Sequence, residues 1–154
     1  MSRTVIVAGA FLALVVVYAG LSSVWVGADE GWYDRLPKPP WQPPDWVFGV
    51  IWPLNFLALG VVGVALARAD ADRAVRVLVV LAVSVACALG WAYLFYVPHA
   101  LTGSAAALAA AAALTWVVLA MAARMVPWTG LALAPYALWV TLATTLGFWY
   151  AANA

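Results

Sequence analysis

Residues 4–27 read TVIVAGAFLALVVVYAGLSSVWVG, without a single charged side chain. A helix needs about 20 mostly apolar residues to cross a bilayer, so this stretch is long enough to span one. Backbone groups in hydrocarbon must be hydrogen-bonded within their own segment, which favours helices and excludes an open sheet. The sequence therefore predicts an all-α integral membrane protein: a single domain, a bundle of five transmembrane helices covering about residues 4–27, 46–67, 77–97, 104–123 and 128–152.

The overall composition excludes a soluble domain. Of the 154 residues, 68% are hydrophobic and 8% are charged, whereas an ordinary soluble domain has roughly 25% charged residues. So few charges cannot cover a water-facing surface. The formal net charge of +1 gives no basic face for nucleic acid, so we expect no such partner. The single cysteine, Cys87, excludes an internal disulfide, and no Cys/His cluster predicts a metal site.

The basic residues predict an orientation in the membrane. Short loops rich in Lys and Arg stay in the cytoplasm. Five arginines flank one end of the predicted bundle, and only Arg35 and Lys38 flank the other; the five are Arg3, Arg68, Arg73, Arg76 and Arg124. We therefore expect a cytoplasmic N-terminus, with the C-terminus and the segment between the first two helices outside.

The segment between the first two spans is rich in proline and tryptophan. Residues 31–46 contain five prolines and three tryptophans. Proline fixes φ and disfavours helix for the residue before it, so we expect a stiff, largely extended loop. Its aromatic rings either lie in the headgroup region of the membrane or pack down onto the bundle.

Three motifs carry a resemblance to a known family. They read WYDRLPKPPWQPPDW at 32–46 followed by FGVIWPL at 48–54, WAYLFY at 91–96, and PYALWVTLAT at 135–144. With these motifs the chain resembles, over nearly its whole length, the TspO/MBR family of tryptophan-rich sensory proteins, translocator proteins and peripheral benzodiazepine receptors. The resemblance implies a membrane receptor or sensor for a planar apolar ligand, a porphyrin such as protoporphyrin IX or haem.

The candidate binding residues lie on shared helix faces. Residues four apart share a face, which pairs Trp52 with Phe56 and Trp91 with Phe95. Trp139 is followed at this spacing by small residues, which suits a flat ligand but also suits close helix packing. The resemblance implies ligand walls at Trp52 and Trp139, closed from the loop side. The candidate ligand-binding residues are Ser23, Tyr33, Pro43, Phe48, Trp52, Phe56, Trp91, Phe95, Trp139, Ala143 and Gly147.

At three positions the chain departs from the family pattern. The family usually has an asparagine three residues before the tryptophan of the third helix, where this chain has Ala88, and commonly a serine after that tryptophan, where it has Ala92. A further asparagine of the fifth helix is replaced by Gly147. We therefore expect a more apolar pocket, which holds a flat ligand by stacking.

Two other functions remain open beside the receptor. One is an enzyme that degrades porphyrin in light, with Trp52 and Trp139 as catalytic electron donors, and the other is a transporter of the ligand. Ionisable residues within membrane spans are functional by default, and their near absence here speaks against a pump and against acid–base catalysis. The resemblance implies no required cofactor, contact with membrane lipid, and a homodimer.

Smaller features have alternative interpretations. His99, the only histidine, is either a solvated loop residue or a lone haem ligand. Asp34, Arg35 and Lys38 either form ion pairs that hold the first loop or contact the propionates of a porphyrin. Small residues also recur at four-residue spacing, a pattern typical of close helix packing, at Gly63 with Ala67 and at Ala82, Ala86 and Gly90.

Overall fold

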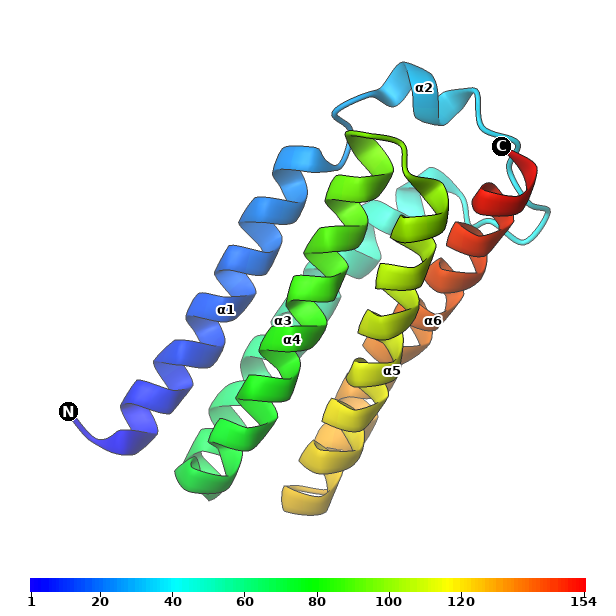
Figure 1. Ribbon diagram of the computed structural model, residues 1–154. Helices are drawn as coiled ribbons and strands as arrows, with labels where there is room; N and C mark the ends of the chain where they lie inside the picture. Colours follow the sequence, from blue (N-terminus) through cyan, green and yellow to red (C-terminus); the bar gives the residue numbers. More distant parts are fainter.

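The computed structural model describes all 154 residues as one bundle of helices without strands. The short α2 (Glu30–Asp34) lies across one end of the bundle (Figure 1). The five other helices are long and apolar enough to cross a membrane, which confirms the predicted fold class. They are α1 (Arg3–Trp25), α3 (Asp45–Ala69), α4 (Ala71–Tyr96), α5 (Leu101–Met125) and α6 (Trp128–Asn153).

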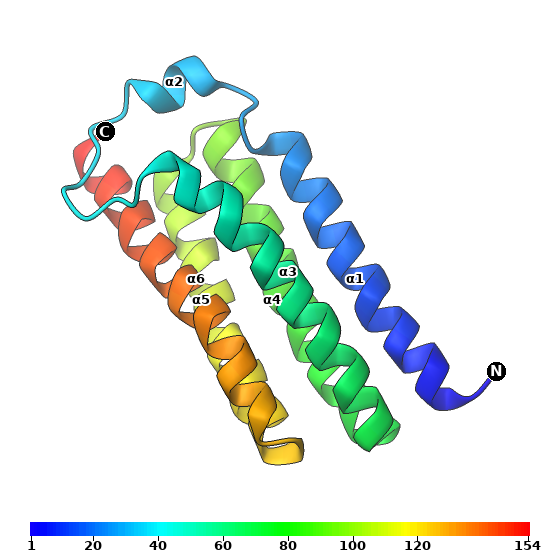
Figure 2. The ribbon, with the colours of Figure 1, turned by 180° about the vertical axis from the view of Figure 1, so that it is seen from behind.

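The long helices are arranged with α1 at one side of the bundle. α4 packs most extensively against α5, and α5 against α6, whereas α1 packs against α3 and α4. Seen from behind, α1 and α3 lie side by side and α6 lies beyond α3 (Figure 2). We call the end with α2 and the C-terminus the lid end. The opposite end, with the N-terminus and five arginines, is the basic end; the arginines are Arg3, Arg68, Arg73, Arg76 and Arg124.

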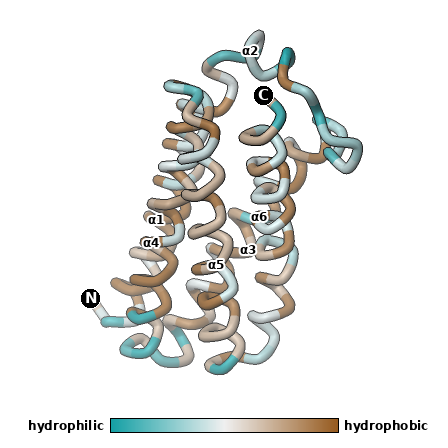
Figure 3. The backbone as a smooth tube through the Cα atoms, turned by 45° about the vertical axis from the view of Figure 1, so that its right-hand side comes forward, coloured by the Kyte–Doolittle hydropathy of each residue, from teal (hydrophilic) through white to brown (hydrophobic).

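Hydrophilic residues gather at these two ends, and the middle of the bundle is hydrophobic (Figure 3). At the basic end Arg3 forms an ion pair with Asp72 at 2.6 Å, which joins the start of α1 to the first turn of α4. This distribution matches a hydrocarbon solvent around the middle and water at both ends.

Capping side chains explain where two helices begin. The Asp70 carboxylate accepts a hydrogen bond from the Arg73 amide at 3.0 Å, so α4 begins at Ala71, six residues before the predicted start at 77. The charged first turns of α4 lie outside the apolar stretch, and an apolar count alone does not include them. The Asp29 carboxylate likewise accepts from the Trp32 amide at 3.0 Å.

Residues 30–34 correct one expectation about the first loop. They form the helix α2 rather than extended chain. Asp29 caps this helix, and the first proline of the segment, Pro37, comes only after it. The extended conformation therefore begins where the prolines begin.

A close approach of backbone and side chain joins α1 to α3. Phe11 of α1 is buried, and a Cβ added at Gly63 would lie 2.5 Å from the Cβ and ring of Phe11. Small residues let membrane helices approach in this way, as the sequence predicted for Gly63. The same prediction is wrong for residues 82–90, because Ala86 is exposed and the space around Gly90 is open.

Buried hydroxyl groups bond across the helices where no water can reach them. The hydroxyls of Ser84 in α4 and Thr115 in α5 lie 3.1 Å apart, and both donate to the carbonyl of Ala111. Tyr136 of α6 donates to the hydroxyl of Tyr18 of α1 at 3.2 Å. Such bonds satisfy polar groups that would otherwise be unpaired in hydrocarbon.

Replacing Gly63 with alanine should weaken the contact between α1 and α3. The new Cβ would overlap Phe11, and overpacking of this kind reduces the free energy of unfolding by about 1–3 kcal/mol. Thermal unfolding of the purified protein in detergent measures the effect. Gly90→Ala is the matched control, since nothing lies within 4 Å of its new Cβ. Equal melting temperatures for the two variants would contradict the proposed contact.

Candidate ligand-binding site

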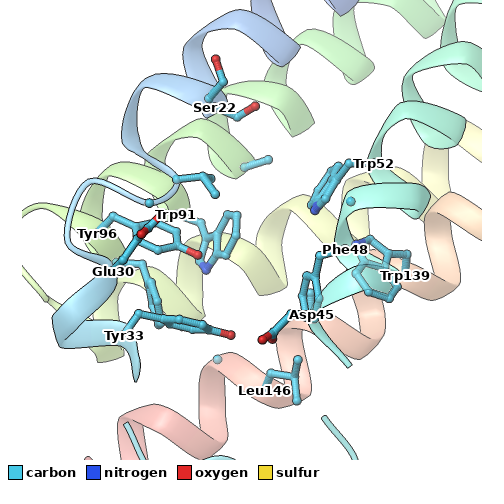
Figure 4. Close-up of a pocket in the computed structure, with 18 of the residues that line it drawn as sticks. Ser22, Glu30, Tyr33, Asp45, Phe48, Trp52, Trp91, Tyr96, Trp139 and Leu146 are labelled. Carbon is cyan, nitrogen blue, oxygen red and sulfur yellow. The ribbon is translucent and has the colours of Figure 1, made fainter. Parts of the chain in front are cut away.

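A cavity of about 600 Å³ lies at the lid end of the bundle, between α1, α3, α4 and α6 (Figure 4). α5 contributes nothing to its wall. The cavity reaches the surface between α1 and α3, where Ser23, Val26 and Gly49 line it and are exposed. The site is therefore enclosed by four helices but open at one side.

Most of the predicted site residues come together on the wall of this cavity. Ten of the eleven line it: Ser23 of α1, Tyr33 of α2, Phe48, Trp52 and Phe56 of α3, Trp91 and Phe95 of α4, and Trp139, Ala143 and Gly147 of α6. Pro43 does not line it. The proline belongs to the extended segment before α3, and the wall on this side is formed instead by Asp45 and Phe48 in the first turn of α3.

Aromatic side chains form opposite walls of the cavity. On α3 the rings of Trp52 and Phe56 are stacked with their centroids 5.7 Å apart, and on α4 Trp91 and Phe95 lie 6.2 Å apart. The ring of Tyr18 meets Phe56 edge-on at 5.2 Å and closes the end that faces the middle of the membrane. These faces present flat, polarisable surfaces on which a planar molecule can stack.

Trp139 brings a polar group to the wall that the protein leaves unpaired. Its side chain is 8% exposed and packs against the edge of Phe48 at 5.0 Å. Its indole N–H is buried and has no hydrogen-bond partner. Buried donors are nearly always paired, so this N–H is an exception among the groups of the wall.

Gln42 holds the lid, residues 28–44, over the cavity. Its side-chain amide donates to the hydroxyl of Tyr33 at 3.1 Å, and its side-chain oxygen accepts from the hydroxyl of Tyr150. One side chain thus connects α2 to the last turns of α6. Leu36 is buried beside Phe95, which adds apolar contact beneath the lid.

Tryptophan side chains hold the rest of the lid. Trp41 donates to Thr145 Oγ1 at 3.2 Å, and Trp149 donates to the carbonyl of Pro37, also at 3.2 Å. The Trp41 and Trp149 rings meet edge to face at 5.1 Å. Of the two interpretations of the loop, packing onto the bundle describes these rings, whereas Trp46, 70% exposed, faces outward.

His99 packs against the lid and does not line the cavity. Its ring stacks on Trp32 with centroids 3.8 Å apart, and its Nε2 lies 3.7 Å from the carboxylate of Asp29. The residue lies in the loop between α4 and α5, and its side chain is 32% exposed, with Trp32 stacked on one face of the imidazole.

Comparison with known proteins adds to this geometry. The model of the TspO/MBR family matches residues 10–151. The chain belongs to the TspO/MBR family. It is 32% identical to the protein CrtK of Rhodobacter capsulatus over 76% of this chain and 74% of that protein. It is also 32% identical to the tryptophan-rich protein TspO of Chlorobaculum tepidum, over 89% and 87%. Identity to the tryptophan-rich sensory protein of Cereibacter sphaeroides is 29%, over 77% and 74%.

This TspO/MBR chain is thus a multi-pass membrane protein, and its three departures from the family pattern fall at different places. Ala88 lines the cavity. Ala92 is buried away from the wall. Gly147 lines the cavity and also packs on α5, where its Cβ would lie 3.5 Å from the backbone of Ala105. Both interpretations of the small residues after Trp139, ligand wall and helix packing, therefore apply to Gly147.

Several residues of the wall were not among the predicted set. Tyr18 and Ser22 are four residues apart on one face of α1, but neither is three or four residues from Ser23, so helical spacing from Ser23 would have indicated Ala19 and Val26 instead. Tyr150 lies one turn beyond the predicted small residues of α6. Glu30 and Asp45 lie in or next to the segment between the first two spans, and no spacing rule connects them to the cavity.

Replacing Gln42 with leucine should loosen the lid while keeping its bulk. The variant loses two hydrogen bonds, each contributing about 0.5–1.5 kcal/mol, so local opening becomes roughly tenfold more frequent. The reporter is the Leu36 amide, which bonds to the carbonyl of Tyr33 at 3.1 Å and should exchange with deuterium correspondingly faster. Thr141→Val, which removes the acceptor of Trp116 outside the lid, is the control. Unchanged Leu36 exchange in Gln42→Leu would show that other contacts hold the lid.

Proposed function

We propose that this TspO/MBR protein is a membrane receptor or sensor that binds a planar apolar ligand in the cavity, and that this ligand is a porphyrin, protoporphyrin IX or haem. The observation that carries the proposal is the set of aromatic faces on α3, α4 and α6 around one cavity beneath a closed lid. The name of the Cereibacter sphaeroides relative, a tryptophan-rich sensory protein, supports the receptor role.

The size and chemistry of the cavity support a flat apolar ligand. Ligand pockets typically enclose about 300–1,000 Å³ and are lined mainly by apolar and aromatic side chains, with few polar groups. This cavity, of about 600 Å³, lies within that range. With Ala88 on the wall, stacking supplies most of the attraction.

The placement of charged residues favours binding over acid–base catalysis. The carboxylates of the wall belong to Glu30, Asp34 and Asp45, which lie in the lid or at the first residue of α3. None lies between the aromatic faces. A general acid or base must be within hydrogen-bond reach of the reacting atom, and a ligand stacked on Trp52 and Trp91 meets aromatic carbon and indole groups.

Trp52 and Trp139 are two of the three tryptophans that line the cavity. The double substitution Trp52→Ala and Trp139→Ala removes two stacking surfaces. Stacking on an aromatic side chain contributes about 0.5–1.5 kcal/mol beyond burial, so together they should weaken binding at least tenfold. A dark absorbance titration of the detergent-purified protein with protoporphyrin IX measures this. Trp128→Ala, a half-exposed tryptophan outside the cavity, is the matched control and should bind like the wild type.

A second variant tests the site without emptying it. Ala143 lines the cavity from α6, and Ala143→Leu fills space that the ligand would occupy while adding apolar bulk. We expect protoporphyrin IX binding to fall at least tenfold, with little change in thermal unfolding. Saturable binding of equal strength in the wild type, Ala143→Leu and the tryptophan variant would place the ligand elsewhere, and no saturable binding by the wild type would refute the porphyrin proposal.

We also propose that the lid end faces the outside of the membrane, since the arginines of the basic end favour the cytoplasm. In a Cys87→Ser background, a cysteine at exposed Pro40 should react with a membrane-impermeant maleimide on intact cells. A cysteine at exposed Ala69 should not. The opposite labelling pattern would reverse the orientation.

A further inference from the structure

The wall of the cavity carries negative charge and no positive charge. Glu30, Asp34 and Asp45 line it, and no lysine, arginine or histidine does. Glu30 and Asp34 belong to the lid and Asp45 is the first residue of α3, so all three lie at the lid end of the cavity, which we call its mouth. Glu30 lies beside Tyr96, and Asp45 lies across the mouth with its carboxylate toward the hydroxyl of Tyr33 (Figure 4).

Two of these carboxylates have no ionic partner in the protein. Asp34 lies 3.8 Å from the amine of Lys38, whose charge sits over the ring of Tyr33. Glu30 and Asp45 take part in no ion pair. Acidic residues in the first turn of a helix interact favourably with its dipole, which accounts for their stability in α2 and α3. This interaction with the helix dipole does not cancel the negative potential that Glu30 and Asp45 produce at the mouth.

The interior of the cavity presents aromatic faces and one unpaired donor. The faces of Trp52 and Trp91 attract cations through the negative face of the indole ring. At the inner side, the buried N–H of Trp139 lacks an acceptor. The wall thus offers carboxylates at the mouth, aromatic faces along the sides and a single unpaired donor within.

We propose that the cavity selects planar aromatic ligands by charge: it favours a ligand that carries a positive charge at the edge facing Glu30 and Asp45, and disfavours one with a carboxylate there. The inference rests on the proposed function, because it concerns the same cavity, and it names the charge class of the ligand. Among porphyrins, those with esterified carboxyl groups bind better than the free acids.

Three acridines that share one ring plane test this selection. They are N-methylacridinium, a cation, acridine, neutral at neutral pH, and acridine-9-carboxylate, an anion. Dissociation constants are measured from acridine fluorescence with wild-type protein in an uncharged detergent. We expect the cation to bind about tenfold more tightly than the anion, with acridine between them. Added salt should reduce this ratio, because Glu30, Asp34 and Asp45 are exposed and salt screens exposed charges.

Substitutions test whether the carboxylates of Glu30 and Asp45 cause this charge selection. Glu30→Gln with Asp45→Asn should lower the ratio to about threefold or less. Glu30→Lys, at an exposed position, should shift the ratio further in favour of acridine-9-carboxylate. Asp72→Asn makes the same change in charge at the basic end, where Asp72 pairs with Arg3, and should leave the ratio unchanged.

Each outcome decides one question. Equal binding of the three acridines, no saturable binding of any, or a ratio that survives both mouth variants overturns the charge selection. If the selection fails while Ala143→Leu still blocks protoporphyrin IX, the proposed porphyrin site stands. If the cation is preferred and protoporphyrin IX does not bind, the selection stands and the porphyrin assignment fails.

Discussion

The hydrogen bond between Tyr18 and Tyr136 determines how deep the cavity is. These two hydroxyls, 3.2 Å apart and fully buried, join α1 to α6, which otherwise barely touch. Toward the basic end the interior is filled by side chains such as Phe11 and Leu66. Toward the lid end, α1 and α6 face each other across open space. Without water in the hydrocarbon, each hydroxyl depends on protein partners, so the bond holds the two helices together at the depth where the cavity ends.

The lid is held by a different kind of interaction. Five prolines between residues 37 and 44 remove backbone donors, so side chains must connect this segment to the bundle. Gln42, Trp41 and Trp149 do so with a few directional bonds to or from α6. Segments with few buried contacts and few backbone bonds open more readily than helices. The lid therefore opens and loosens more readily than the helices when those bonds break.

Sequence reasoning predicted the helices better than their ends, and the wall better than the mouth. Hydropathy identifies the five spans because a helix must be apolar over most of its length to cross the membrane. The start of α4 depends instead on the cap at Asp70, and the formation of α2 depends on the cap at Asp29, each a single side-chain contact. Helical spacing paired Trp52 with Phe56, and the resemblance to the family joined this pair to Trp91 in one expected pocket. Neither argument could place Pro43 outside the cavity or Glu30 on its wall, because both positions depend on the path of a loop. Residues 82–90 show that small-residue spacing alone does not distinguish a packed face from a lipid-facing one.

The opening beside Ser23 and Gly49 affects what determines the fraction of cavities that hold a ligand. Both residues belong to membrane-spanning helices, so the gap between α1 and α3 is turned toward the bilayer. An apolar ligand partitions strongly into lipid, where its local concentration far exceeds that in water. The occupancy of the cavity then depends on the mole fraction of ligand in the membrane. A receptor built this way reports the load of a small molecule dissolved in its own bilayer, and modest affinity is enough for it to do so.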